Sequence, residues 1–205
     1  MKRLTFTLIA FALLLAACGT KQNNVVDKRA DGSLQAEKVF NAKTGQPEGT
    51  WKYYYPDGSL FATARFSPAK PLGTNWQFLT TDGKPYFSQH YDSLAVTELG
   101  DEQTPATVVL HVADTQYWYQ FYSTCALRSV GTTVANVRQG RWQFFYPNGQ
   151  LQTDATFVDG REEGRYCVYR DNGSPYYLGQ YEAGQRSGVW EVYDAEGNLV
   201  TTKQW

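Results

Sequence analysis

Aromatic and apolar residues come in short alternating runs along this chain, separated by turns that contain glycine. The clearest unit opens with Gly-x-Trp, continues through aromatic residues and reaches Asp-Gly or Asn-Gly; it occupies residues 49–60 and returns at residues 140–151. Asp-Gly and Asn-Gly between alternating segments are the strongest short-range hairpin signal, because both turn residues must tolerate positive φ. Pro56 and Pro147 lie just before the turns, where a missing N–H does least harm. The pattern therefore predicts strand, turn, strand, turn.

The unit recurs with a period of about 24 residues, which is typical of repeat architectures in which each unit is one supersecondary element. Trp142, Tyr166 and Trp190 are evenly spaced at this interval, a looser copy occupies residues 73–83, and residues 31–34 resemble the tail of another copy. We therefore expect an all-β fold of successive antiparallel hairpins.

A degenerate copy is predicted around Trp118, which lies one repeat interval before Trp142. Gln116 and Cys125 stand at its two glycine positions, which weakens the match. Asn136 lies the same interval before Gly160, and Asn tolerates left-handed backbone better than most residues. Because Asn136 matches Gly160 in this way, we interpret the segment around Trp118 as a degenerate copy of the repeat.

Residues 91–116 match no repeat and are interpreted as an insertion that contains a strand at 108–112. We therefore predict five segments along the chain. They are a signal peptide at 1–17, a tether with a degenerate first repeat at 18–45, N-terminal repeats at 46–90, the insertion at 91–116 and C-terminal repeats at 117–205.

Composition narrows the classes of function. Fifteen Tyr, eleven Phe and six Trp, with 18 Gly and one Met among 205 residues, favour strands and tight turns. The chain has 19 basic and 20 acidic residues and lacks the basic patch that phosphate binding needs. We therefore expect no nucleic-acid partner.

The N-terminal segment that ends at Cys18 has the features of an export signal. Residues 2–3 are basic, residues 4–15 are apolar, and two alanines precede Cys18. The apolar run is shorter than the roughly 20 residues that span a bilayer, which disfavours an uncleaved anchor. The segment resembles a bacterial lipoprotein signal, and this implies that Cys18 becomes an acylated N-terminus. Because Gly19 follows it, we expect a lipid-anchored envelope protein of the outer membrane.

Few residues suggest catalysis. His90, Asp92 and Ser93 cluster in sequence, but neighbours on a strand point to opposite faces, so they do not form a triad. The acidic residues at 98–102 and 162–163 are interpreted as solvated connectors rather than a glycosidase pair. No zinc-ligand spacing or phosphate loop occurs in the sequence. We expect no metal, no cofactor and no enzyme; a hydrolase built around residues 91–116 is a remote alternative.

The units at 157–166 and 181–190 resemble the bacterial variant of the MORN repeat, also labelled the YwqK-type antitoxin repeat. The resemblance covers residues 46–90 and 117–205. It implies an elongated single-layer antiparallel sheet of successive hairpins, without catalytic residues, that contacts proteins or membranes. An antitoxin- or immunity-like role follows from the label, although an exported, lipid-anchored chain differs from a cytoplasmic antitoxin.

Two further cysteines, Cys125 and Cys167, lie two repeats apart in this alignment. Four strand steps span about 19 Å, whereas a disulfide needs Cα atoms within about 7 Å. We predict two unpaired thiols.

Aromatic residues occupy both faces of the predicted sheet. The Trp positions are expected to form the core, because Trp buries the larger area. The residues three positions after the Trp point to the other face and are our candidates for binding a protein partner: Tyr54, Phe145, Tyr169 and Tyr193. A carbohydrate- or cell-wall-binding module is the alternative function.

Overall fold

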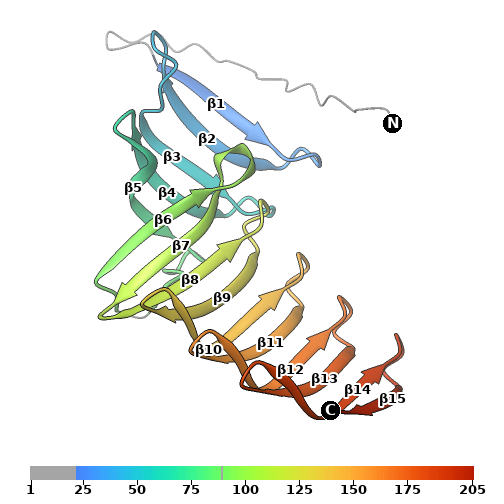
Figure 1. Ribbon diagram of the computed structural model, residues 1–205. Helices are drawn as coiled ribbons and strands as arrows, with labels where there is room; N and C mark the ends of the chain where they lie inside the picture. The colour runs from blue at the N-terminus through green and yellow to red at the C-terminus, as the bar shows by residue number, and fades with distance from the viewer. Residues whose placement is uncertain (1–21, 89) are drawn as a thin grey trace, which may run out of the picture. The chain divides into compact units, whose positions relative to one another are not determined.

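The computed structural model describes residues 22–88 and 90–205, and it confirms the all-β fold of antiparallel hairpins (Figure 1). The chain forms two compact units, whose described residues are 22–88 and 90–205. Each unit holds one sheet, and within each sheet every strand pairs with its neighbours in sequence. The fold is therefore a meander of hairpins in both units.

The first unit is a five-stranded sheet in the order β1-β2-β3-β4-β5. Its strands are β1 (Gln22–Lys28), β2 (Leu34–Asn41), β3 (Gly49–Tyr54), β4 (Leu60–Ser67) and β5 (Lys70–Phe78). The rings of Trp51 and Phe66 are stacked with their centroids 4.0 Å apart, and Tyr53 is fully buried.

The second unit is a ten-stranded sheet in which β6 to β15 follow one another in sequence order. Its strands are β6 (Ser93–Leu99), β7 (Pro105–Val112), β8 (Thr115–Phe121), β9 (Leu127–Val134), β10 (Val137–Phe145), β11 (Leu151–Val158), β12 (Arg161–Tyr169), β13 (Pro175–Glu182), β14 (Gln185–Tyr193) and β15 (Leu199–Gln204). A 3₁₀ turn (Asp101–Gln103) joins β6 to β7. The strand predicted at 108–112 lies in β7, so the segment read as an insertion adds strands to the repeat sheet.

The Asn-Gly turn between β10 and β11 differs from the predicted type. Only Gly149 has positive φ, at 84°, so the expectation that both residues take positive φ is wrong. The Gly149 N–H donates to the Tyr146 carbonyl at 2.9 Å, and the Tyr146 N–H donates to the Gln150 carbonyl at 2.8 Å. This is a type I turn closed by a glycine bulge, with Pro147 at the position that favours its φ.

The connectors between repeats are the turns in which both residues have positive φ. Asp159 and Gly160 have φ of 49° and 78°, and Ala135 and Asn136 have φ of 50° and 64°. This is the type I′ geometry that matches strand twist. The left-handed role predicted for Asn136 is confirmed.

The turn of the degenerate copy at Trp118 has the geometry of the other copies. Cys125 has φ of 68° and donates its N–H to the Tyr122 carbonyl at 2.9 Å, as Gly149 does to Tyr146. Gln116, which replaces the first glycine, pairs with His111 in a ladder without a bulge. Loss of that glycine therefore removes the bulge while the hairpin remains.

The Gly-x-Trp signature forms a bulge that lays an indole on a glycine. Residues 140–142 lie opposite Gly131 alone, because the ladder between β9 and β10 shifts there, and Gly140 has φ of 66°. A Cβ added to Gly131 would lie only 2.0 Å from Cδ2 of Trp142. Nε1 of Trp142 donates to the Thr132 carbonyl at 3.0 Å. The indole is thus buried against backbone.

Large and small residues alternate across the second sheet, and we call this line the Trp row: Trp118, Gly131, Trp142, Ala155, Tyr166, Gly179 and Trp190. Glycine lies beneath a tryptophan, as Gly179 does beneath Trp190, whereas Ala155 accompanies the smaller Tyr166. Arginine covers the outer side of the indoles, with the guanidinium carbons of Arg138 and Arg186 lying 4.6 and 4.5 Å from the ring centroids of Trp142 and Trp190. Trp142 and Trp190 are consequently only 6% and 4% exposed.

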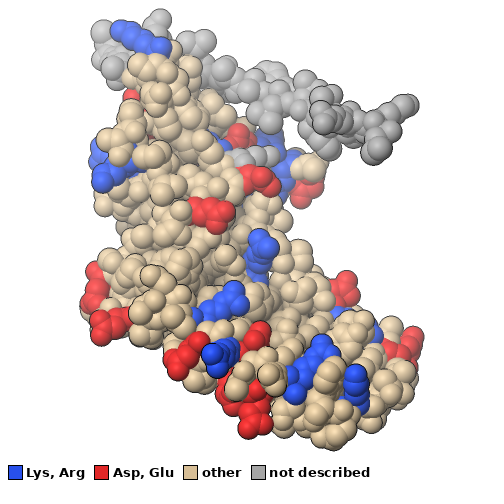
Figure 2. Space-filling view, in the orientation of Figure 1, with Lys and Arg blue, Asp and Glu red and all other residues tan. Residues whose placement is uncertain are grey.

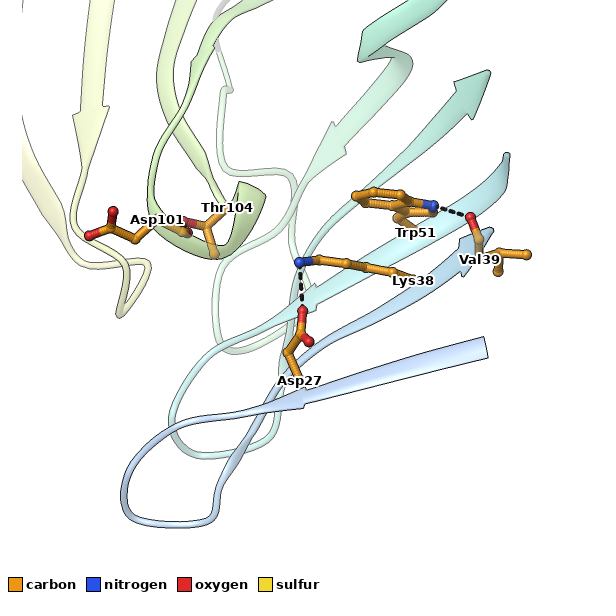
Figure 3. Close-up of polar contacts among 6 residues, drawn as sticks. All are labelled: Asp27, Lys38, Val39, Trp51, Asp101 and Thr104. Carbon is orange, nitrogen blue, oxygen red and sulfur yellow. Dashed lines mark hydrogen bonds and ion pairs between the residues drawn. The ribbon is translucent and has the colours of Figure 1, made fainter. Parts of the chain in front are cut away.

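In the first unit the indole hydrogen bond is kept, but Lys38 rather than a glycine lies opposite Trp51. Nε1 of Trp51 donates to the Val39 carbonyl at 2.9 Å, and Nζ of Lys38 lies 5.6 Å from the ring centroid (Figure 3). Lys38 in turn pairs with Asp27, whose carboxylate oxygen is 2.5 Å from Nζ. Both charged side chains are largely buried, so each depends on the other for compensation.

We expect Gly131→Ala to destabilise the protein by about 2–3 kcal/mol in urea denaturation, because the added Cβ overlaps the Trp142 ring. Adding Trp142→Tyr recreates the Ala155–Tyr166 combination, so the double variant should be more stable than the two single effects predict, by at least about 1 kcal/mol. Purely additive effects would contradict the packing described here.

Candidate functional site

The four candidate binding residues lie on the face opposite the Trp row and its equivalent in the first unit. Tyr193 donates its hydroxyl to Glu191 at 2.7 Å, and Glu191 is adjacent to Trp190, which places it on the other face. Tyr54 donates to Glu37 at 2.8 Å. All four candidates, Tyr54, Phe145, Tyr169 and Tyr193, are half-buried. Cys18 lies outside the described residues.

A hydrogen bond between repeats fixes the backbone at each candidate, and the sequence had not revealed it. The side chain that begins each turn donates to the carbonyl at the candidate position of the next repeat. The donor and acceptor pairs are Arg29 and Tyr54, Tyr122 and Phe145, Tyr146 and Tyr169, and Arg170 and Tyr193. The candidate positions therefore join neighbouring repeats.

Two of the candidates form charged hydrogen bonds that shift pKa values. Burial, followed by the hydrogen bond to Glu37, raises the pKa of Tyr54 to about 12. The same bond lowers the pKa of Glu37. The hydrogen bond to Glu191 raises the pKa of Tyr193. These phenols stay protonated at neutral pH and act as donors.

Two of the acidic residues considered for catalysis accept backbone hydrogen bonds. A carboxylate oxygen of Asp92 accepts the Ala113 N–H at 2.8 Å, and one of Glu163 accepts the Ala183 N–H at 2.8 Å. Within residues 22–88 and 90–205, no three His, Cys, Asp or Glu side chains come together as a metal site. Among the same residues, no helix has the length and apolar character to cross a membrane.

Cys125 and Cys167 are both buried, and they are not joined in a disulfide. Cys125 lies in the turn between β8 and β9, and Cys167 lies in β12. Burial is the main cause that raises the pKa of Tyr169, and the hydrogen bond with the Cys167 thiol raises it further.

The Trp face of the second sheet, which carries the Trp row, contains an open groove that the sequence did not indicate. We call it the tyrosine groove; its volume is about 440 Å³, and it is lined by Tyr146, Gln152, Thr153, Tyr166, Val168, Tyr176, Tyr177, Tyr181, Arg186 and Trp190. The volume falls within the roughly 300–1,000 Å³ of ligand sites. The lining comes from five successive strands and their turns, β10 to β14.

Burial and hydrogen bonding shift two phenols of this groove. Burial is the main cause that raises the pKa of Tyr166. The hydrogen bond with Tyr176, whose hydroxyl oxygen is 2.9 Å away, raises the pKa of Tyr177. Arg186 is the one charged residue of the lining. Figure 2 shows that basic and acidic side chains are mixed over the face in view rather than gathered by sign.

The family model described as MORN repeat variant matches residues 47–67 and 138–159. These segments contain the hairpins β3–β4 and β10–β11. No curated protein matches the chain. The fold and the two matches define a repeat protein of β-hairpins, an architecture that fits contact with other proteins.

Proposed function

We propose that this chain is a non-catalytic envelope protein, anchored by acylated Cys18, that binds a protein partner through the face opposite the Trp row. The observation that carries the proposal is the regular placement of Phe145, Tyr169 and Tyr193. They recur once per repeat on β10, β12 and β14, so that successive positions lie about 10 Å apart across the sheet.

The row of candidates is well suited to recognition because it is rigid. Hydrogen bonds from the preceding turns hold the three backbone carbonyls. Partly exposed aromatic residues on a backbone held in this way lose less conformational entropy on binding than residues on a mobile segment. Aromatic residues are also enriched among the residues that dominate interfaces. Repeat arrays present such residues over extended surfaces.

The anchor places the first unit close to the membrane. β1 begins at Gln22, four residues after Cys18. Four residues of extended chain span at most about 14 Å. Acylation at Cys18 would therefore hold β1 within that distance of the bilayer surface.

We expect replacement of Phe145, Tyr169 and Tyr193 by Ser to abolish stoichiometric capture of the partner from envelope extracts while cooperative unfolding is kept. Tyr176→Ser, which removes an exposed ring from the other face, is the matched control and should capture normally. Unchanged capture by the folded triple variant would refute the assigned face. Unfolding of the triple variant would show that these rings belong to the core.

The membrane-bound protein should begin at an acylated Cys18, since residues 1–17 have the features of a signal that is removed. Mass spectrometry of the membrane fraction measures this directly. An intact Met1, or an unmodified Cys18, would contradict the anchor without affecting the proposed binding face.

A further inference from the structure

The tyrosine groove exists because one repeat departs from its neighbours. Tyr166 replaces the tryptophan found at 142 and 190, and Val168, like Val192 in the next repeat, occupies the position of Phe144 in the preceding repeat. Two smaller side chains thus leave space above β12. The hollow follows from the sequence of this repeat and needs no change in the backbone pattern.

The cover over the row also differs in this repeat. Arg138 and Arg186 lie over Trp142 and Trp190, whereas the equivalent position in the intervening repeat is Glu162. The ring of Tyr166 therefore lacks the arginine that lies over its neighbours. It is half-buried, whereas both tryptophans are buried.

Aromatic edges and faces surround the hollow. The rings of Tyr166 and Tyr181 meet edge to face at 5.1 Å, and those of Tyr181 and Trp190 do so at 5.2 Å. Across the groove, Tyr176 and Tyr177 have ring centroids 3.9 Å apart. Ring edges and faces combined with hydroxyl groups suit a ligand that has both C–H and O–H surfaces.

Arg186 supplies a positive charge at this site. Its guanidinium carbon lies 4.5 Å from the ring centroid of Trp190 and 5.1 Å from that of Trp205. Among the described residues, no carboxylate forms an ion pair with Arg186, whereas Arg141 on the opposite face is paired with Asp154. A planar guanidinium held between rings is suited to bind a carboxylate with two hydrogen bonds.

We propose that the tyrosine groove binds a glycan whose pyranose rings carry a carboxylate. The apolar faces of the sugar pack on the half-buried rings of Tyr166 and Tyr181, and its carboxylate pairs with Arg186. Gln152 and Thr153 provide further polar groups for hydroxyls. This site is separate from the proposed protein-binding face, since the two lie on opposite sides of the sheet.

A peptide is a poorer occupant on physical grounds. The groove lies over internal strands whose backbone groups pair within the sheet, so strand addition has no edge there. Nε1 of Trp190 already donates to the Gln180 carbonyl at 3.1 Å. Proline-rich peptides dock on aromatic-lined grooves, and this groove cannot offer them that indole N–H.

The test is calorimetric titration of the full chain in detergent with matched saccharides. Trigalacturonic acid and a disaccharide of N-acetylglucosamine and N-acetylmuramic acid are the acidic probes; galactotriose and chitobiose are their neutral counterparts. We expect at least one acidic probe to bind about tenfold more tightly than its counterpart. Absence of binding by both acidic probes, or equal binding of the neutral ones, overturns the proposal.

Substitutions in the tyrosine groove test whether the saccharide binds there. Val168→Phe, which restores the residue of the preceding repeat, should weaken acidic binding at least about tenfold by filling the groove. Arg186→Gln should remove the preference for the acidic probe, whereas Arg138→Gln, the same change outside the groove, should not. Unchanged binding in both Val168→Phe and Arg186→Gln, or displacement of the sugar by a proline-rich peptide, contradicts the site.

Discussion

The second sheet depends on one contact, an indole lying on a glycine of the preceding strand with its N–H bonded to the adjacent carbonyl. The bulge at Gly140 turns Trp142 onto Gly131, and Thr132 accepts the indole hydrogen. A buried indole needs both apolar cover and an acceptor. The backbone beneath the ring supplies the acceptor and the apolar cover on that side, and Arg138 covers the outer side of the ring.

Alternation of large and small residues extends this contact across several strands. Trp142 and Trp190 each lie on glycine, and the intervening Tyr166 is matched by Ala155. The smaller ring opens the tyrosine groove, while Phe145 and Tyr169 remain on the other face. One repeat unit thus gives a common framework in which a few substitutions create different surfaces.

Much of the fold could be predicted from local signals. Positive φ at Asn136 followed from its alignment with a glycine, because turn geometry depends on few consecutive residues. Positive φ at Cys125 was not predicted, since a cysteine at that glycine position had only weakened the match. The turn at Gly149 was assigned the wrong type, since Pro147 favours a type I turn that the Asn-Gly pair alone does not indicate.

The packing partners and the groove were harder to predict. No sequence motif links Gly131 to Trp142. The small residues Gly131, Ala155 and Gly179 do recur at the interval of the repeat. The importance of these small residues comes from pairing across strands, which a linear pattern does not express. The groove likewise depends on side-chain volumes in adjacent strands.

Hydrogen exchange of the indole N–H protons, measured by NMR, tests the central contact most directly. The indole protons of Trp51, Trp142 and Trp190, each bonded to a backbone carbonyl, should exchange slowly. That of Trp205, whose side chain is 49% exposed, should exchange quickly. Exchange at Trp142 and Trp190 as fast as at Trp205 would contradict the account.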